Sequence, residues 1–179
     1  MTPEALATLH RAAFVIDRAW SAAEFRALLE SPYCHVTTRP QGFALWRAVA
    51  DEAELLTIAT HPDHRRKGIA ANLMARWMAA AQTSASTAFL EVAADNAPAV
   101  TLYAQFGFDL VARRLRYYKR GDHAVDALIL RARLPFSDLE KSSGGLPRSG
   151  QWGQTAPRPG LQCLARSGPD ARANAVKSG

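Results

Sequence analysis

Residues 55–71 read LLTIATHPDHRRKGIAA, and they predict more of the fold than any other segment of this 179-residue chain. An apolar strand leads into a turn at 61–63, and a cationic loop at 65–68 precedes a helix that begins near Ile69. The first amides of a helix lack intrahelical acceptors and carry part of a positive charge. The segment therefore predicts an anion site, for which phosphate or pyrophosphate is the natural ligand.

The residue types of this loop suit such a ligand. Gly68 allows close approach of the backbone, Ala70 and Ala71 are small, and three adjacent cations can add charge-assisted contacts. The Walker pattern and the dinucleotide fingerprint are both absent from the sequence, so neither a P-loop nor a Rossmann site is expected. A solvated surface loop can carry the same residues, and only the flanking sequence distinguishes the two interpretations.

Local signals on both sides of the segment define further elements. Thr2-Pro3 can start a helix, and Ser21 with Glu24 forms a capping box whose hydrophobic staple pairs Trp20 with Phe25. The helix that starts there ends before residue 32. Strands are predicted at 33–38, 43–49, 53–60, 87–93, 108–118 and 123–134, and helices at 69–82 and 97–106, the latter ended by Gly107. This order predicts a mixed α/β sheet covered by helices.

The composition excludes several classes of protein. A net charge of +6, from 22 Lys and Arg against 16 Asp and Glu, favours polyanionic partners or cofactors. The longest uncharged segment, 77–90, has 14 residues and includes polar side chains, so no membrane-spanning helix is expected. An early Glu4 argues against a secretion signal, and two cysteines are too few for a disulfide framework. We expect a cytoplasmic protein.

The composition changes near residue 135. Of the 45 residues from 135 to 179, 18 are Gly, Pro or Ser, and the bulky apolar residues follow no helix or strand period. Such a segment cannot bury enough apolar surface to offset its ordering entropy. The sequence therefore predicts a folded domain over 1–134 and a disordered basic tail over 135–179. That tail is either an arm that touches nucleic acid or an inert extension.

The flanking sequence resembles that of a known superfamily. Arg65-x-x-Gly68-x-Ala70 after an apolar strand is similar to the acetyl-coenzyme A (acetyl-CoA) signature Gln/Arg-x-x-Gly-x-Gly/Ala of the GNAT acyltransferases. The segment 90–108, with Leu-Glu-Val followed by Asn-x-x-Ala-x-x-Leu-Tyr, resembles a block of the RimI-type N-terminal alanine acetyltransferases of ribosomal proteins. The resemblance covers 1–134 and implies the GNAT fold, a mixed and mostly antiparallel sheet whose parallel strands splay at the acetyl-CoA site.

The resemblance also implies an activity. Acetyl would pass directly from acetyl-CoA to the α-amine of a protein N-terminus, an alanine of a ribosomal protein, in a monomer or a weak dimer that needs no metal. One alternative keeps the coenzyme and acetylates a small amine or a lysine side chain. Another is a non-catalytic module that binds coenzyme A or RNA. Lys119 stands where the family usually has proline, which leaves the acceptor specificity open.

The resemblance assigns roles to particular residues. The backbone of the strand end would pair with the pantetheine arm, the loop would bind the pyrophosphate, and a helix-capping asparagine would contact the coenzyme. These coenzyme-binding residues are Ile58, Ala59, Thr60, Arg65, Arg66, Lys67, Gly68, Ile69, Ala70, Ala71 and Asn96. Family members often have Val-Asp at positions 60–61 and Gly at position 70, but neither difference removes a backbone donor.

Glu91 and Tyr103 are the predicted catalytic residues. Glu91 lies in an otherwise apolar strand, where a buried carboxylate is costly unless it is paired or faces a cleft. The pattern alone favours a strand ion pair, whereas the resemblance implies a general base. Tyr103 is either a core side chain beside Leu102 and Phe106 or, as the resemblance implies, the acid that protonates the coenzyme A thiolate.

The late strand carries the predicted acceptor-binding residues. Arg114, Tyr117 and Tyr118 are expected to face the peptide groove, together with Arg113 and Arg116. A solvated basic strand would show the same composition. The scattered histidines are given no catalytic role.

Overall fold

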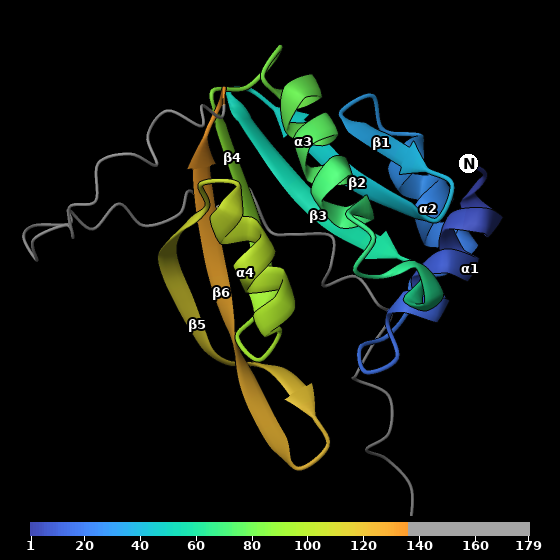
Figure 1. The fold of residues 1–179 in the computed structure, drawn as a ribbon, viewed down its shortest axis with the longest axis vertical. Coiled ribbons are helices and arrows are strands. Elements are labelled where there is room, and N and C mark those ends of the chain that lie inside the picture. Colours follow the sequence, from blue (N-terminus) through green and yellow to red (C-terminus); the bar gives the residue numbers. More distant parts are fainter. Residues whose placement is uncertain (136–179) are drawn as a thin grey trace, which may run out of the picture. The chain divides into compact units, whose positions relative to one another are not determined.

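Six strands lie in the order β1–β2–β3–β4–β6–β5 in a computed structural model that describes residues 1–135 (Figure 1). The elements along the chain are α1 (Pro3–Ala13), α2 (Ala22–Leu29), β1 (Cys34–Arg39), β2 (Gly42–Val49), β3 (Glu52–Thr60), η1 (Pro62–His64), α3 (Ile69–Ala81), β4 (Thr87–Ala93), α4 (Ala97–Gln105), β5 (Asp109–Arg120) and β6 (His123–Arg133). The predicted mixed α/β order is confirmed, with strand and helix boundaries that differ by one or two residues.

The predicted start signals act as expected. The Thr2 side chain accepts a hydrogen bond from the amide of Ala5 at 3.3 Å, and Pro3 occupies the first turn of α1. Both hydrogen bonds of the Ser21–Glu24 capping box are present at the start of α2. These contacts satisfy amides that would otherwise lack acceptors, each contributing about 1 kcal/mol.

Two helix pairs cover the two faces of the sheet. On one face, α1 and α2 pack on the sheet around a buried cluster that includes Phe25, Phe43 and Leu45 (the α1–α2 cluster). On the other face, α3 and α4 pack around a larger cluster that includes Trp77 and Leu90 (the α3–α4 cluster). In Figure 1, α3 and α4 lie on the near face of the sheet. A fully buried side chain of this size contributes about 1.5–3 kcal/mol, so these two clusters fix the sheet between the helices.

Strands β3 and β4 form the one parallel pair described in the sheet, and they separate partway along their length. Residues 52–55 of β3 pair with residues 87–90 of β4, after which the two strands have no mutual register. Both continue, to Thr60 and Ala93 respectively, and Figure 1 shows them diverging. The splay that the family resemblance implied is therefore present, and it leaves one edge of β3 without a strand partner.

A β-bulge in β3 lies where the strands separate. Leu45 pairs with Thr57 and Trp46 pairs with Leu55, so Leu56 is an extra residue. Trp46 belongs to the α3–α4 cluster and Leu45 to the α1–α2 cluster. Thr57, as the partner of Leu45, therefore faces α1 and α2, and Leu56 packs on the same side. A bulge of this kind redirects side chains and is common next to active sites.

The predicted tail, 135–179, lies outside the described residues except for Pro135, and its boundary with the domain stays a prediction. None of the helices within residues 1–135 combines the length and apolarity that crossing a membrane requires.

Candidate active site

The loop before α3 presents a row of free amides. Arg66 and Gly68 have φ values of 63° and 75°, and Gly68 caps α3 without any side-chain hydrogen bond. The amides from Arg66 to Ala71 have no hydrogen-bond acceptor within residues 1–135. Left-handed backbone is costly for a residue such as Arg66. The conformation therefore concentrates amide donors at the helix start, where an anion would be bound.

The three cations of this loop are not equivalent. Arg65 Nη2 donates to the carbonyl of Ala13 at 2.8 Å, at the C-terminal end of α1. Lys67 Nζ donates to the carbonyl of Asp63 at 3.2 Å. The side chain of Arg66 makes neither an ion pair nor a hydrogen bond with another described residue. Sequence reasoning assigned all three to a phosphate, whereas the Arg65 guanidinium also links the loop to α1.

The edge of β3 beyond its last pair with β4 is open. Ile58, Ala59 and Thr60 pair with β2 on one side, and no strand of the described chain pairs with them on the other. The hydroxyl of Thr60 is buried and has no hydrogen-bond partner among residues 1–135. This edge can therefore bind an extended polar chain through backbone hydrogen bonds.

Glu91 lies on β4, directly beyond its last pair with β3. Its side chain is 23% exposed, and Oε2 lies 2.7 Å from Arg114 Nη1. Burial raises the pKa of Glu91 above its ordinary value. The charge of Arg114 and hydrogen bonds from Tyr118 and Tyr117 oppose that rise, while Glu54 adds to it. The carboxylate is thus an ion-pair partner and a group that can take up a proton.

Arg114 and Tyr118 reach Glu91 across the strand between them. On β6, Ala127 pairs with Arg114 on one side and with Ala93 of β4 on the other. The methyl group of Ala127 leaves room for longer side chains from β5 to pass over β6. Tyr118 Oη donates to Glu91 Oε1 at 3.3 Å. The structure therefore brings predicted acceptor-binding residues together with the predicted base.

A bulge between Arg114 and Tyr118 of β5 keeps both side chains on one face of the strand. Arg114 pairs with Ala127 and Tyr118 with Val125, so three residues of β5 face the single residue Asp126. The amide of Arg116, whose φ is 52°, donates to Asp126 Oδ1 at 2.8 Å. Because two extra residues preserve the alternation, Arg114 and Tyr118 still face the same side as Glu91.

The prediction that all the arginines of this strand face the groove is wrong for Arg113. Its side chain pairs with Asp126 at 3.3 Å, and its register partner Leu128 belongs to the α3–α4 cluster. Strand alternation places Arg113 on the face opposite Arg114. The bulge at Arg116 could not be anticipated, because neither Gly nor Asn marks it in the sequence.

Tyr103 lies in α4, on the side of the sheet opposite to the one that Glu91 faces. It is 6% exposed, and the carbonyl of Tyr103 accepts from the amide of Phe108 at 3.2 Å, while Gly107 donates to Ala104 at 3.1 Å. Together with the φ of 75° at Gly107, these bonds form a Schellman motif that ends α4. The Phe108 ring packs against Tyr103, with ring centroids 6.1 Å apart.

Burial strongly raises the pKa of Tyr103, so its phenol keeps its proton at physiological pH. Its hydroxyl makes no hydrogen bond with any other described side chain, so its proton is available to a ligand. At the start of the same helix, Asn96 Oδ1 accepts from the amide of Ala99 at 3.3 Å, which confirms its predicted capping role.

Arg120 joins three segments of the chain, a role that sequence reasoning missed. Its side chain is 12% exposed and contacts Asp95 at 2.6 Å and Asp17 at 3.1 Å. Asp17 lies in the α1–α2 loop and Asp95 in the β4–α4 turn. No local signal marks such a contact, because Asp17 and Arg120 are 103 residues apart.

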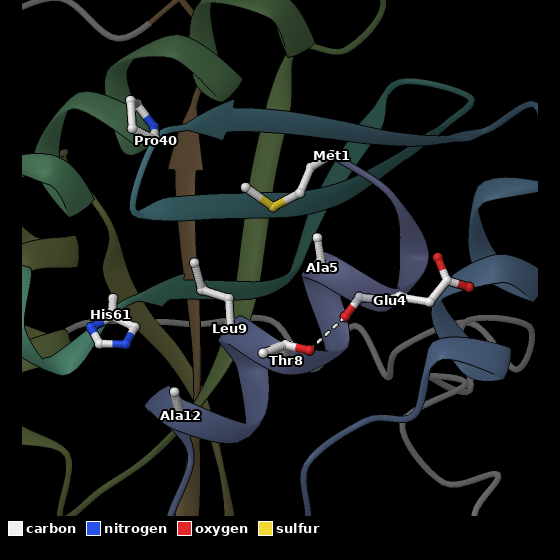
Figure 2. A pocket seen from close by; sticks show the side chains of 8 residues that line it. All are labelled: Met1, Glu4, Ala5, Thr8, Leu9, Ala12, Pro40 and His61. Atoms are coloured by element: carbon white, nitrogen blue, oxygen red, sulfur yellow. Dashed lines mark hydrogen bonds between the residues drawn. The ribbon is translucent and has the colours of Figure 1, made fainter.

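An open groove of about 410 Å³ lies elsewhere, along the outer side of α1 (Figure 2). Its lining residues are Met1, Glu4, Ala5, Thr8, Leu9, Ala12, Pro40 and His61. None of them belongs to the predicted site. Within residues 1–135, no group of three or more His, Cys, Asp and Glu side chains is placed to hold a metal ion.

The chain is similar to acetyltransferases of known families. The model of the acetyltransferase (GNAT) family matches residues 5–108. The [ribosomal protein bS18]-alanine N-acetyltransferase of Escherichia coli K12 is 33% identical over 116 residues, which are 62% of this chain and 78% of that protein. The N-alpha-acetyltransferase RimI of Mycobacterium tuberculosis is 32% identical over 122 residues, covering 63% of this chain and 76% of its own length.

A solved structure agrees with these matches. The crystal structure of the ribosomal-protein-S18-alanine N-acetyltransferase from Escherichia coli superimposes with a TM-score of 0.67 and 28% identity. The match covers 73% of this chain and 86% of that protein. The fold is therefore similar to that of an N-acetyltransferase.

Proposed function

Because the chain belongs to the acetyltransferase (GNAT) family, we propose that it transfers acetyl from acetyl-CoA to the α-amine of a protein N-terminus, an alanine of a ribosomal protein. The observation that carries this proposal is the opening between β3 and β4. Glu91 directly follows the last β3–β4 pair and faces the α1–α2 side, and Tyr103 belongs to the cluster on the α3–α4 side. A base and an acid on opposite sides of one opening suit an acyl transfer between two bound substrates.

The donor would be bound by backbone groups. The unpaired amides from Arg66 to Ala71 can bind the pyrophosphate, and Arg66 can add a charge-assisted contact. The open edge of β3 at Ile58, Ala59 and Thr60 can pair with the pantetheine arm. An amide of that edge can face the thioester oxygen as negative charge develops, which for one donor is worth about 10²–10³ in rate.

Glu91 would remove the proton from the acceptor. An α-ammonium has a pKa of about 7.7–8.0, against about 10.4 for lysine, so its deprotonation requires less help. The raised pKa of Glu91 brings its basicity closer to that of the amine. The neutral amine then forms the new C–N bond, and the C–S bond of the thioester breaks.

Tyr103 would supply the proton to the departing sulfur. Its phenol stays protonated because burial raises its pKa. The ammonium loses one proton to Glu91 before the attack, and the nitrogen of the C–N adduct loses a second proton to water as the C–S bond breaks, while the thiolate takes its proton from Tyr103. Once the Tyr103 phenolate has regained a proton from water and Glu91 has released its own, the net products are the amide, the thiol and one proton.

The acceptor class is inferred from the relatives whose names specify ribosomal protein bS18. We propose that residues 1–134 carry the catalytic activity. We also propose that Asn96 contacts the coenzyme in addition to capping α4. We further propose that the protein works in the cytoplasm, where ribosomal proteins are made.

The test compares three acceptors with the full-length protein and acetyl-CoA, measuring released thiol. They are a peptide with an N-terminal alanine, the same peptide with a blocked N-terminus and an internal lysine, and spermidine. We expect release with the first acceptor alone. Release with the blocked peptide or spermidine would favour a lysine or small-amine acetyltransferase, and no release with any acceptor would favour a binding module. In cells lacking the protein, mass spectrometry should find a ribosomal protein with a newly unacetylated alanine.

A further inference from the structure

Thr57 on β3 carries a buried hydroxyl that none of the residues 1–135 satisfies. The residue is 9% exposed, and its Oγ1 has no hydrogen-bond partner in the described part of the chain. Leaving such a group unpaired costs about 1–3 kcal/mol, so buried hydroxyls without partners are uncommon and need a reason. A ligand that completes the hydrogen bond is one such reason.

The bulge in β3 determines where this hydroxyl points. Thr57 pairs with Leu45, whose side chain lies in the α1–α2 cluster. Without the bulge, regular alternation through Leu55, Leu56 and Thr57 would give Thr57 the same face as Leu55, toward α3. The bulge instead gives Thr57 and Leu56 the same face.

Thr57 and Glu91 therefore border the same side of the opening. Leu55 and Leu90 are the last parallel pair, and Glu91 directly follows Leu90. Glu91 faces the α1–α2 side, because its neighbours Leu90 and Val92 belong to the α3–α4 cluster. On this face of the sheet, β4 thus carries a carboxylate at the opening and β3 an unsatisfied hydroxyl.

We propose that Thr57 Oγ1 accepts a hydrogen bond from the acceptor's α-amine and so orients its lone pair toward the thioester. The inference rests on the proposed function. An α-ammonium has three N–H groups, and Glu91 takes one proton. The remaining amine has two N–H groups and one lone pair, and in an opening shielded from water these N–H groups need acceptors. A hydrogen bond from one of these N–H groups to Thr57 Oγ1 directs the lone pair of the amine away from the hydroxyl.

The chain offers a matched pair of variants for the test. Thr57→Val keeps the shape of the side chain and removes the hydroxyl, whereas Thr57→Ser keeps the hydroxyl. We expect Thr57→Val to lower kcat/KM for the alanine peptide about 10-fold, corresponding to the loss of one hydrogen bond to a charged or reacting group. Coenzyme A affinity should match that of the parental protein, and thermal stability should not fall, because the substitution removes an unpaired buried hydroxyl. Thr57→Ser should retain most of the activity.

Calorimetry of the alanine peptide with the coenzyme A complex gives a readout that does not depend on turnover. Weaker peptide binding to Thr57→Val than to Thr57→Ser supports the proposal. Equal kcat/KM and equal peptide binding for the two variants overturn it. A loss of coenzyme A affinity in Thr57→Val would assign the hydroxyl to the coenzyme and also overturn it. If the parental protein neither binds nor acetylates the alanine peptide, the proposed function itself fails, whatever the variants do.

Discussion

Arg114 and Glu91 form an ion pair over the intervening strand β6, with 2.7 Å between Nη1 and Oε2. Burial and the charge of Arg114 have opposite effects on the pKa of the Glu91 carboxyl group. Burial raises the pKa of Glu91, and the guanidinium charge is the largest effect that lowers it. Arg114 thereby limits how far burial can move the base from its ordinary value. In the proposed reaction, the acceptor's ammonium meets a carboxylate that already has a cationic partner.

Arg114→Ala should move the acidic limb of the pH–rate profile to higher pH. Without the positive charge, the pKa of Glu91 rises further, and the base is protonated over a wider range of pH. The loss of kcat/KM should therefore be larger at pH 6 than at pH 8. Initial rates with the alanine peptide across pH 5.5–9 would measure this.

Arg113→Ala is the matched control, because its side chain pairs with Asp126 on the opposite face. Its profile should keep the parental midpoint. Equal midpoints for Arg114→Ala and the parental protein would contradict the role of Glu91 as the titrating base.

Tyr103→Phe should lower kcat by about 10²–10⁴, the range expected for loss of a general acid. Coenzyme A affinity should change little, because the proposed binding groups are the amides of residues 66–71 and the edge of β3, which this substitution leaves in place. The melting temperature should not fall, since the ring and its packing on Phe108 are kept. Single-turnover assays and calorimetry separate these effects. Parental turnover in this variant would mean that another group, or water, protonates the thiolate.

Gly68→Ala should weaken coenzyme A binding at least about 10-fold. A Cβ at Gly68 meets no protein atom within 4 Å, so the space beside it is available to a ligand, and the φ of 75° disfavours alanine by about 1 kcal/mol. Gly121→Ala is the control, because Gly121 has a φ of 57° and equally open surroundings at the tip of the β5–β6 hairpin. Similar coenzyme A affinities for the two variants, measured by calorimetry, would argue against a phosphate at the start of α3.

His10 should make the protein less stable as the pH falls from about 6.5 to about 4. The imidazole is 2% exposed, and its Nδ1 accepts from the amide of Trp20 at 3.3 Å. Burial, aided by the charge of Arg18, lowers the pKa of His10 from 6.5 to about 4. The unfolded state therefore binds an additional proton in this window, which lowers the free energy of unfolding by up to about 3 kcal/mol.

The measurement is urea unfolding at pH 7 and pH 5. His10→Phe should lose this part of the pH dependence, whereas His123→Gln, at an exposed position, should keep it. An unchanged slope in His10→Phe would assign the acid sensitivity to other groups.

Local signals were enough to predict most of the elements. The capping box at Ser21, the proline at position 3 and the left-handed Gly107 act over a few residues, and the structure has each as expected. The conformation of the loop before α3 was also predictable, because its free amides belong to consecutive residues, whereas its binding of an anion stays a prediction. Glu91 and Tyr103 were identified through family motifs rather than through periodicity.

The contacts that complete the site join segments far apart in the sequence. Arg65 donates a hydrogen bond to Ala13, 52 residues away. Tyr118 reaches Glu91 across β6, which comes after both residues in the sequence. The bulge at Leu56 decides where Thr57 points, yet Leu-Thr is an ordinary strand sequence. Such features depend on register between strands, which a single sequence does not specify.

The bridge from Arg120 to Asp17 and Asp95 has a consequence for biosynthesis. During translation the α1–α2 loop leaves the ribosome long before the Arg120 side chain that binds it, so the α1–α2 side of the domain can be completed only after β5 has emerged. A nascent chain in which the loop before α3 has already formed would therefore still lack this ion-pair bridge until nearly the whole domain has been synthesised.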